Sequence, residues 1–190
     1  EIKKSSSSLF LTNGPKLDLF EQRFKKFTKS KYAVGVSNAT AALYLSLKAL
    51  GIKKNDEVII PDLTFAATAN SVLQTGAIPV LADIDEQTLN ISAESIIKNI
   101  SRKTKAIIPV HLAGTPCDMQ KIMKIARSNS LKVIEDCAHG IGTSYNKKHV
   151  GNFGNVGCFS FYPTKNLTTI EGGMVITNDK KIADFIQLAR

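Results

Sequence analysis

Lys165 and Asp136 are the two side chains of this sequence best suited to do chemistry together. Lys165 lies in the segment 160–166 (SFYPTKN), in a turn between two apolar runs. An amine withdrawn from water can lose its proton and form a Schiff base with an aldehyde. Asp136 comes at the end of an apolar run that includes residues 133–134, where a carboxylate could hold a protonated heterocycle nitrogen. Each residue also has a plainer interpretation, because a single Lys is usually exposed and Asp136 could cap a helix.

Residues 37–41 (SNATA) stand where a strand should pass into a helix, and such a junction can bind phosphate. The first N–H groups of a helix have no acceptor within it, and the helix dipole favours an anion there. Small side chains in this segment would let an anion approach closely, and Ser160 could add a hydroxyl. Many helices begin in this way, so a simple helix start is the alternative.

Together with Phe65, whose ring could stack on a flat heterocycle, these groups match the requirements of one cofactor. Phosphate donors, an acid for a ring nitrogen, a Lys for an aldehyde and an aromatic face are the parts that a pyridoxal 5′-phosphate enzyme needs. The joint occurrence is much less frequent by chance than any single motif. The set therefore predicts pyridoxal phosphate as the cofactor.

The elements that must position this set alternate between strands and helices. We expect strands at residues 32–36, 58–60, 78–83, 106–110, 133–134, 158–161 and 174–177, and helices from residue 14, at 39–50, 66–74, 92–100 and 118–128, and from 179 to the end. Alternation with continuous apolar strands predicts a three-layer α/β fold, a mostly parallel sheet flanked by helices. Ligands bind at the carboxyl ends of such strands. The segments there are residues 37–40, 62–65, 111, 136–139 and 162–166.

Composition excludes several other classes of protein. The 190 residues are 43% hydrophobic and 22% charged, which fits one domain with a sizeable core and excludes a disordered, collagen-like or coiled-coil chain. The net charge of +9 comes from scattered Lys pairs without interleaved aromatics, so we expect a solvated surface and no nucleic-acid partner, with a nucleic-acid-binding module as the alternative. No apolar run reaches about 18 residues and no signal peptide is evident, so we expect a cytoplasmic protein without a membrane partner.

Cysteine and histidine do not indicate a metal site. Cys117, Cys137 and Cys158 are odd in number and widely spaced, so we expect buried, reduced thiols and no bound metal. His111 follows a predicted strand and could reach the site, but a buried core or loop role is the more frequent one. His149 stands beside two Lys residues, so we expect it to be exposed.

Six segments of the chain resemble the DegT/DnrJ/StrS family of sugar aminotransferases. They are residues 11–16, 37–43, 65–70, 105–111, 135–140 and 159–178, and the resemblance extends from about residue 10 to the end. It implies fold type I of the pyridoxal phosphate enzymes, with a large α/β domain, a smaller C-terminal domain and active sites at a homodimer interface. Family members are about twice this length. We therefore expect a loose segment at 1–13, the cofactor-binding large domain at 14–190 and a missing small domain, so that the piece alone binds cofactor poorly or is inactive.

The resemblance also implies a role for each motif residue. Lys165 would be the Schiff-base lysine and Asp136 the partner of the pyridine nitrogen, while Phe65 would stack on the ring. The phosphate would be bound by Ala39 and Thr40, through backbone and hydroxyl, with Ser160 assisting. His139 stands where many members carry Gln, near the ring oxygen of the cofactor.

The implied reaction transfers an amino group from L-glutamate to a nucleotide-linked keto sugar. His139, together with residues 37–40 and 142–145, is most similar to members that act at C4 of UDP-4-keto sugars for cell-surface polysaccharide or lipopolysaccharide synthesis. Lys165 favours transamination over the relative that removes a hydroxyl, in which a His replaces this Lys. Two alternatives stay open: a non-catalytic cofactor-binding regulator or scaffold, and another fold type I enzyme.

Overall fold

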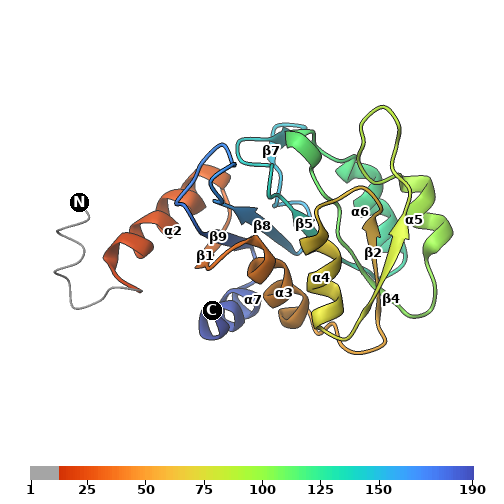
Figure 1. Cartoon of the computed structure of the whole chain (residues 1–190), viewed down its shortest axis with the longest axis horizontal. Helices are drawn as coiled ribbons and strands as arrows, with labels where there is room; N and C mark the ends of the chain where they lie inside the picture. The colour runs from red at the N-terminus through yellow and green to blue at the C-terminus, as the bar shows by residue number, and fades with distance from the viewer. Residues whose placement is uncertain (1–12) are drawn as a thin grey trace.

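A seven-stranded sheet forms the centre of the structure, a computed structural model that describes residues 13–190 (Figure 1). Its strands are β1 (Tyr32–Val36), β2 (Glu57–Pro61), β3 (Ile78–Ala82), β4 (Thr104–Ile107), β5 (Lys132–Asp136), β8 (Val156–Ser160) and β9 (Gly173–Thr177). Their spatial order is β1-β9-β8-β5-β4-β2-β3. All neighbours from β8 to β3 are parallel, whereas β9 runs antiparallel to both β8 and β1. The expected mostly parallel α/β sheet is thus confirmed, with β9 as the reversed strand.

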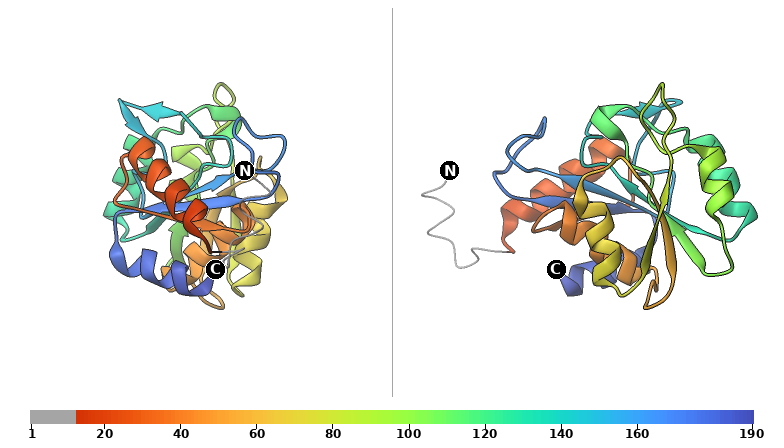
Figure 2. Two further views of the ribbon diagram at one scale, coloured as in Figure 1. Left: turned by 90° about the vertical axis from the view of Figure 1, so that its left-hand side faces the viewer. Right: turned by 45° about the vertical axis from the view of Figure 1, so that its right-hand side comes forward.

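Helices cover both faces of the sheet (Figure 2). They are α2 (Pro15–Thr28), α3 (Ala39–Ala49), α4 (Ala66–Gln74), α5 (Ala93–Asn99), α6 (Met119–Ser128) and α7 (Lys180–Ala189). Apolar side chains of α3, α4 and α7 pack in one cluster against one face. Those of α5 and α6 pack on the other face, where α2 packs beside them over β8 and β9. Because strand side chains alternate, Ile59 of β2 enters one cluster while its neighbours Val58 and Ile60 enter the opposite one.

Local capping explains why the helices begin where the sequence predicts. The Asn38 side chain accepts a hydrogen bond from the Ala41 N–H at 2.8 Å, and Ser92, Asp118 and Asp179 cap α5, α6 and α7 in the same way. Each of these side chains satisfies an N–H that the helix leaves without an acceptor. Every predicted helix therefore appears within a residue or two of its expected bounds.

Strand ends differ more from expectation. The strand predicted at 106–110 is β4 at Thr104–Ile107, because Pro109 has no N–H to contribute and the chain continues beside β5 through a single Val110–Asp136 bridge. The strand predicted at 58–60, which Pro61 was expected to stop, is β2 at Glu57–Pro61, so Pro61 is its last residue. A small hairpin of β6 (Ser144–Tyr145) and β7 (Lys148–His149) was not predicted. Its turn residues Asn146 and Lys147 both have positive φ without the glycine that usually marks such a turn.

The three Cys residues are buried and free, as predicted. None of the helices in the described range is long and apolar enough to span a bilayer. Residues 1–12 of the loose segment expected at 1–13, and with them the first two residues of the motif at 11–16, lie outside the described residues.

Candidate active site

A cavity of about 500 Å³ opens at the edge of the sheet where the parallel strands end. Segments that follow β1, β2, β4, β5 and β8 contribute to its wall, together with the loop 162–172 that leads into β9. The seven residues predicted to form the site all line it: Ala39, Thr40, Phe65, Asp136, His139, Ser160 and Lys165. Lys165 and Asp136, which are far apart in the chain, therefore share one cavity.

Asp136 is the last residue of β5 and is only 4% exposed. Its Oδ1 accepts the Ala138 N–H at 3.1 Å, and its Oδ2 accepts the Thr68 hydroxyl at 3.0 Å. Burial raises the pKa of this carboxyl, because the charged form is poorly solvated, while the two hydrogen bonds oppose the rise. A cation placed in the cavity would favour the ionised form further.

Lys165 lies in the loop 162–172, where its N–H donates to the Tyr162 carbonyl at 2.9 Å and so closes a tight turn. The side chain is half-buried. Desolvation lowers the pKa of the Lys165 amine, and the negative charge of Asp136 partly opposes this. A lowered pKa enlarges the fraction of neutral amine near neutral pH, which is the form that acts as nucleophile or base.

The N-terminus of α3 offers an anion site. The Asn38 side chain occupies the Ala41 N–H, and the Asn38 carbonyl accepts from Ala42. The N–H groups of Ala39 and Thr40 lie in the first turn, so the helix supplies no acceptor for them in the part of the chain that the structure describes. They border the cavity, as suits an anion at the positive end of the helix.

Gly173 and Ser160 form the side of this anion site that the sheet contributes. They are paired in register at the end of β8 and the start of β9. A Cβ on Gly173 would lie 2.5 Å from the Asn38 carbonyl carbon and 2.9 Å from the Ala39 nitrogen, so only glycine lets β9 pass this close. The Ser160 Oγ accepts from the Tyr162 N–H at 3.4 Å, which leaves its own proton for another acceptor.

Phe65 precedes α4 and is 79% exposed although it borders the cavity. Exposing so large an apolar ring costs free energy that a flat ligand would recover by covering it. The ring is thus a surface for stacking that no side chain among the described residues covers.

His139 also lies on the cavity wall, and its orientation is set by the backbone. Its Nδ1 accepts the Ala113 N–H at 3.2 Å, so the neutral ring carries its proton on Nε2. Ala113 has the left-handed φ of 51°, which is strained for a residue other than glycine. Desolvation, and next the nearby Lys165 amine, lower the pKa of His139 and so favour the neutral form.

The other two histidines lie outside the cavity wall. His111 is fully buried, its Nε2 bonded to Glu135 and its Nδ1 accepting the Cys117 N–H, which matches the core role considered for it. Glu135 also accepts three backbone N–H groups of the loop 151–154, so its oxygens are engaged in holding that loop. The prediction that His149 is exposed is wrong, because its ring packs against Phe27 and Phe159.

Thr64 and Tyr162, which line the cavity, belong to the segments 62–65 and 162–166 expected at the strand ends, although no role was predicted for either residue. Glu171, which also lines the cavity, and Thr68, which lies behind Asp136, were not predicted. The i, i+4 spacing of Thr64 and Thr68 was the signal in the sequence that the two side chains could meet.

Comparison with known proteins gives consistent matches. The model of the DegT/DnrJ/EryC1/StrS aminotransferase family matches residues 1–190. The spore coat polysaccharide biosynthesis protein SpsC of Bacillus subtilis (strain 168) is 47% identical over 188 residues, which are 99% of this chain and 48% of that protein. GDP-perosamine synthase of Escherichia coli O157:H7 is 47% identical over 178 residues, or 94% of this chain and 49% of that one. The chain thus spans about half the length of these curated relatives.

A solved structure confirms the fold class. The putative sugar aminotransferase Spr1654 from Streptococcus pneumoniae, in its PLP-form, superimposes with a TM-score of 0.93 at 29% sequence identity. The match covers 98% of this chain and 53% of that protein.

Proposed function

Because this chain belongs to the DegT/DnrJ/EryC1/StrS aminotransferase family, we propose that the full-length protein transfers an amino group from L-glutamate to a nucleotide-linked 4-keto sugar, with pyridoxal phosphate as cofactor. The observation that carries the proposal is the shared cavity of Lys165 and Asp136, with the anion site of α3 on the same wall. In that cavity an amine of lowered pKa and a buried carboxylate stand beside donors for a phosphate.

The donor set fits pyridoxal phosphate part by part. The N–H groups of Ala39 and Thr40 lack a helical acceptor, Ser160 has a proton to donate, and the exposed Phe65 ring suits a flat heterocycle. When bound, pyridoxal phosphate supplies an aldehyde that carries the amino group and a protonated ring that accepts electrons.

In this proposal Asp136 and His139 control the charge at the ring. The Asp136 carboxylate, desolvated and held by two hydrogen bonds, keeps a proton on the ring nitrogen, because an adjacent anion raises the pKa of that nitrogen. His139, with its proton on Nε2, donates a hydrogen bond to the ring oxygen. Phe65 and the cavity wall exclude water from one face of the ring.

Lys165 carries the proton transfer. Desolvation supplies its neutral amine, which is the nucleophile that an aldehyde requires and also a base of suitable strength. With the cofactor bound, the Lys165 amine would take the proton from the α-carbon of glutamate and hold it on Nζ. With the keto sugar bound, the same amine would deliver a proton to the sugar carbon that receives the amino group.

The names of the relatives support a nucleotide sugar and a role in polysaccharide synthesis. UDP-4-keto sugars remain our first candidate, on the resemblance carried by His139 and by residues 37–40 and 142–145. GDP-linked 4-keto sugars are the second, because GDP-perosamine synthase is 47% identical to this chain. We also propose a homodimer that acts in the cytoplasm, as the family resemblance implies.

One spectroscopic experiment tests this proposal. The full-length protein is loaded with pyridoxal phosphate, and its visible absorbance is followed on addition of L-glutamate. We expect the spectrum to change to that of pyridoxamine phosphate with release of 2-oxoglutarate, and a UDP- or GDP-4-keto sugar to restore the first spectrum. A protein that binds the cofactor but does not respond to glutamate would instead be the non-catalytic regulator or scaffold.

A further inference from the structure

A chain of hydroxyl groups runs from the cavity wall to Asp136. The Thr68 Oγ1 lies 3.0 Å from the Asp136 Oδ2 and 2.8 Å from the Thr64 Oγ1. Thr64 lines the cavity and is partly buried, whereas Thr68 is fully buried in the first turn of α4. Thr68, the middle group of the chain, is therefore shielded from water, whereas Thr64 and Asp136 both border the cavity.

The chemistry of the groups fixes the direction of donation. An ionised carboxylate only accepts hydrogen bonds, so Thr68 must donate to Asp136. The Thr68 hydroxyl has one proton, so its oxygen accepts from the Thr64 hydroxyl. The Ala138 N–H donates to the other carboxylate oxygen, so each oxygen has one protein donor and keeps a free lone pair.

The Thr68 position is itself rigid. Its N–H donates to the Phe65 carbonyl at 3.0 Å, and its carbonyl accepts the Ser71 hydroxyl at 2.9 Å. α4 therefore holds the hydroxyl in place, next to the residue expected to stack on the ring.

We propose that Thr68, supported by Thr64, is a positioning residue that orients the Asp136 carboxylate and keeps it ionised to receive a cationic ring nitrogen. The inference rests on the proposed function and assigns a task to a residue that touches neither substrate nor cofactor. A hydrogen bond to a charged group contributes more than one between neutral groups, and its loss in a buried place leaves the charge poorly solvated.

The expected pH effect follows from the surroundings of Asp136. The titratable groups that interact electrostatically with it are His111, His139, Lys165 and the thiols of Cys117, Cys137 and Cys158. None of them changes when the Thr68 hydroxyl is removed. Without that donor the pKa of Asp136 rises further. As the pH is lowered, the variant's carboxylate therefore becomes protonated at a higher pH than that of the wild type. Affinity for a cationic ring is lost at that higher pH too.

The test measures binding of pyridoxamine 5′-phosphate, which has no aldehyde for Lys165, to the full-length protein between pH 5 and 9. Thr68→Val and Thr68→Ala remove the hydroxyl, and Thr68→Ser keeps it. We expect Val and Ala to weaken binding by about ten- to a hundredfold and to shift the acid limb of the profile to higher pH. Thr68→Ser should restore both. Inorganic phosphate serves as a second probe, and its affinity should be the same in all variants.

The outcomes separate this inference from the proposed function. If the wild type binds pyridoxamine phosphate and Thr68→Val and Thr68→Ala match it in affinity and pH profile, the role of Thr68 is refuted while the proposed function stands. If Thr68→Ser is as weak as Thr68→Val, the hydroxyl is not the group that matters, and the inference is also refuted. If the wild type binds neither pyridoxal phosphate nor pyridoxamine phosphate, both proposals are wrong. In an Asp136→Asn background, Thr68→Val should have no further effect if Thr68 acts through Asp136.

Discussion

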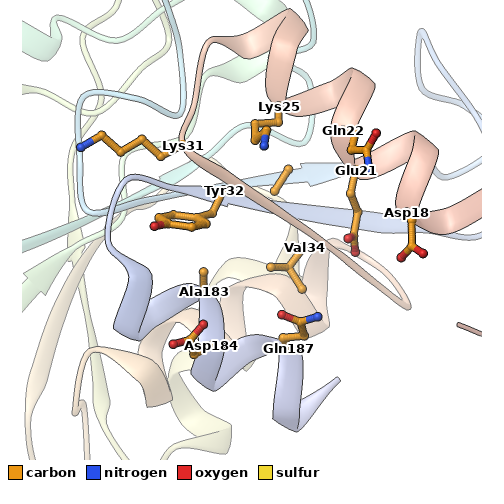
Figure 3. A pocket seen from close by; sticks show the side chains of 11 residues that line it. Asp18, Glu21, Gln22, Lys25, Lys31, Tyr32, Val34, Ala183, Asp184 and Gln187 are labelled. Atoms are coloured by element: carbon orange, nitrogen blue, oxygen red, sulfur yellow. The ribbon is translucent and has the colours of Figure 1, made fainter. Parts of the chain in front are cut away.

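Two hollows of the molecule contrast in how their polar groups are used. The cavity at the carboxyl ends of the strands has about 500 Å³, and the hollow between α2 and α7, over the outer edge of β1, has about 340 Å³ (Figure 3). In the second hollow Glu21 of α2 accepts the Gly35 N–H of β1 at 2.8 Å and pairs with Arg190. Arg190 also donates to the Gly35 carbonyl. Polar groups there serve the edge strand.

At the candidate active-site cavity, several polar groups keep hydrogen-bonding capacity that their own helix or strand does not use. The Ala39 and Thr40 N–H groups lack a helical acceptor, Ser160 has a proton to give, and Phe65 is uncovered. The comparison teaches that the number of charged residues does not identify a site. The hollow of Figure 3 has more charged residues, and Glu21 among them is bonded to the protein's own β1 and Arg190. In the larger cavity, several hydrogen-bonding groups and an uncovered ring border the same space.

The largest effect should come from Lys165→Ala. Loss of the amine should remove the visible absorbance of bound pyridoxal phosphate and lower kcat by about 10²- to 10⁴-fold or more, since both base and nucleophile disappear. The matched control is Lys25→Ala in the hollow of Figure 3, which should leave absorbance and kcat unchanged. Normal turnover by Lys165→Ala, measured in steady-state assays, would remove the basis of the proposed function.

Asp136→Asn should follow, with kcat lowered by about 10²- to 10³-fold, the size expected for one electrostatic group in a buried site. The fold should persist, because Asn keeps the size of the side chain. Asp18→Asn, in the other hollow, is the control and should be neutral. Pre-steady-state measurement of α-proton removal from glutamate checks this, and an unchanged rate for Asp136→Asn would contradict the role of the carboxylate.

Gly173→Ala and Gly35→Ala make a pair that sharpens the comparison. A Cβ at Gly173 meets backbone atoms of Asn38 at 2.5 Å, and a Cβ at Gly35 meets the Leu17 Cδ1 at 2.6 Å. We expect both to lower the free energy of unfolding, by about 1–3 kcal/mol, with Gly35→Ala at the lower end because Leu17 can move. Only Gly173→Ala should weaken cofactor binding, by about tenfold or more, since it displaces the anion site. Equal cofactor affinity in the two variants, measured by fluorescence titration, would argue against that site.

The smallest effect should come from Glu21→Gln in the hollow of Figure 3. The variant removes the charge that pairs with Arg190 but keeps an acceptor for the Gly35 N–H. Stability to urea should fall by about 1 kcal/mol, without change in cofactor affinity. If cofactor affinity fell in Glu21→Gln by more than the measured loss of stability accounts for, the result would show that the two regions are coupled through β1.

Much of the scaffold could be predicted from the sequence because local signals agreed with the final fold. The caps at Asn38, Ser92, Asp118 and Asp179 marked helix starts correctly, and continuous apolar runs marked buried strands. The reversed direction of β9 could not be predicted, because an apolar run has the same composition in either direction. The β6–β7 turn was missed because Asn146 and Lys147 adopt positive φ without glycine.

The site was predicted by residue type at strand ends, and this explains which members were missed. Lys165, Asp136 and Phe65 carry groups whose chemistry is visible in the sequence. Thr68 acts through a contact across 68 positions of the chain, and the task of Ala113 depends on a backbone angle. Neither long-range contacts nor backbone angles are encoded in the residue type, so a single sequence could not reveal them.

The reversal at β9 has a consequence for how the loop that carries Lys165 could be redesigned. The loop 162–172 leaves the end of β8 and returns to the start of β9, and the Phe161 N–H donates to the Gly172 carbonyl at 2.9 Å across its base. The segment is thus a closed insert with both anchors adjacent, so it can be exchanged for a relative's version as a cassette without rethreading any strand. Swapping only this loop would exchange Lys165 and its neighbours, while the anion site at the N-terminus of α3 would remain that of the recipient.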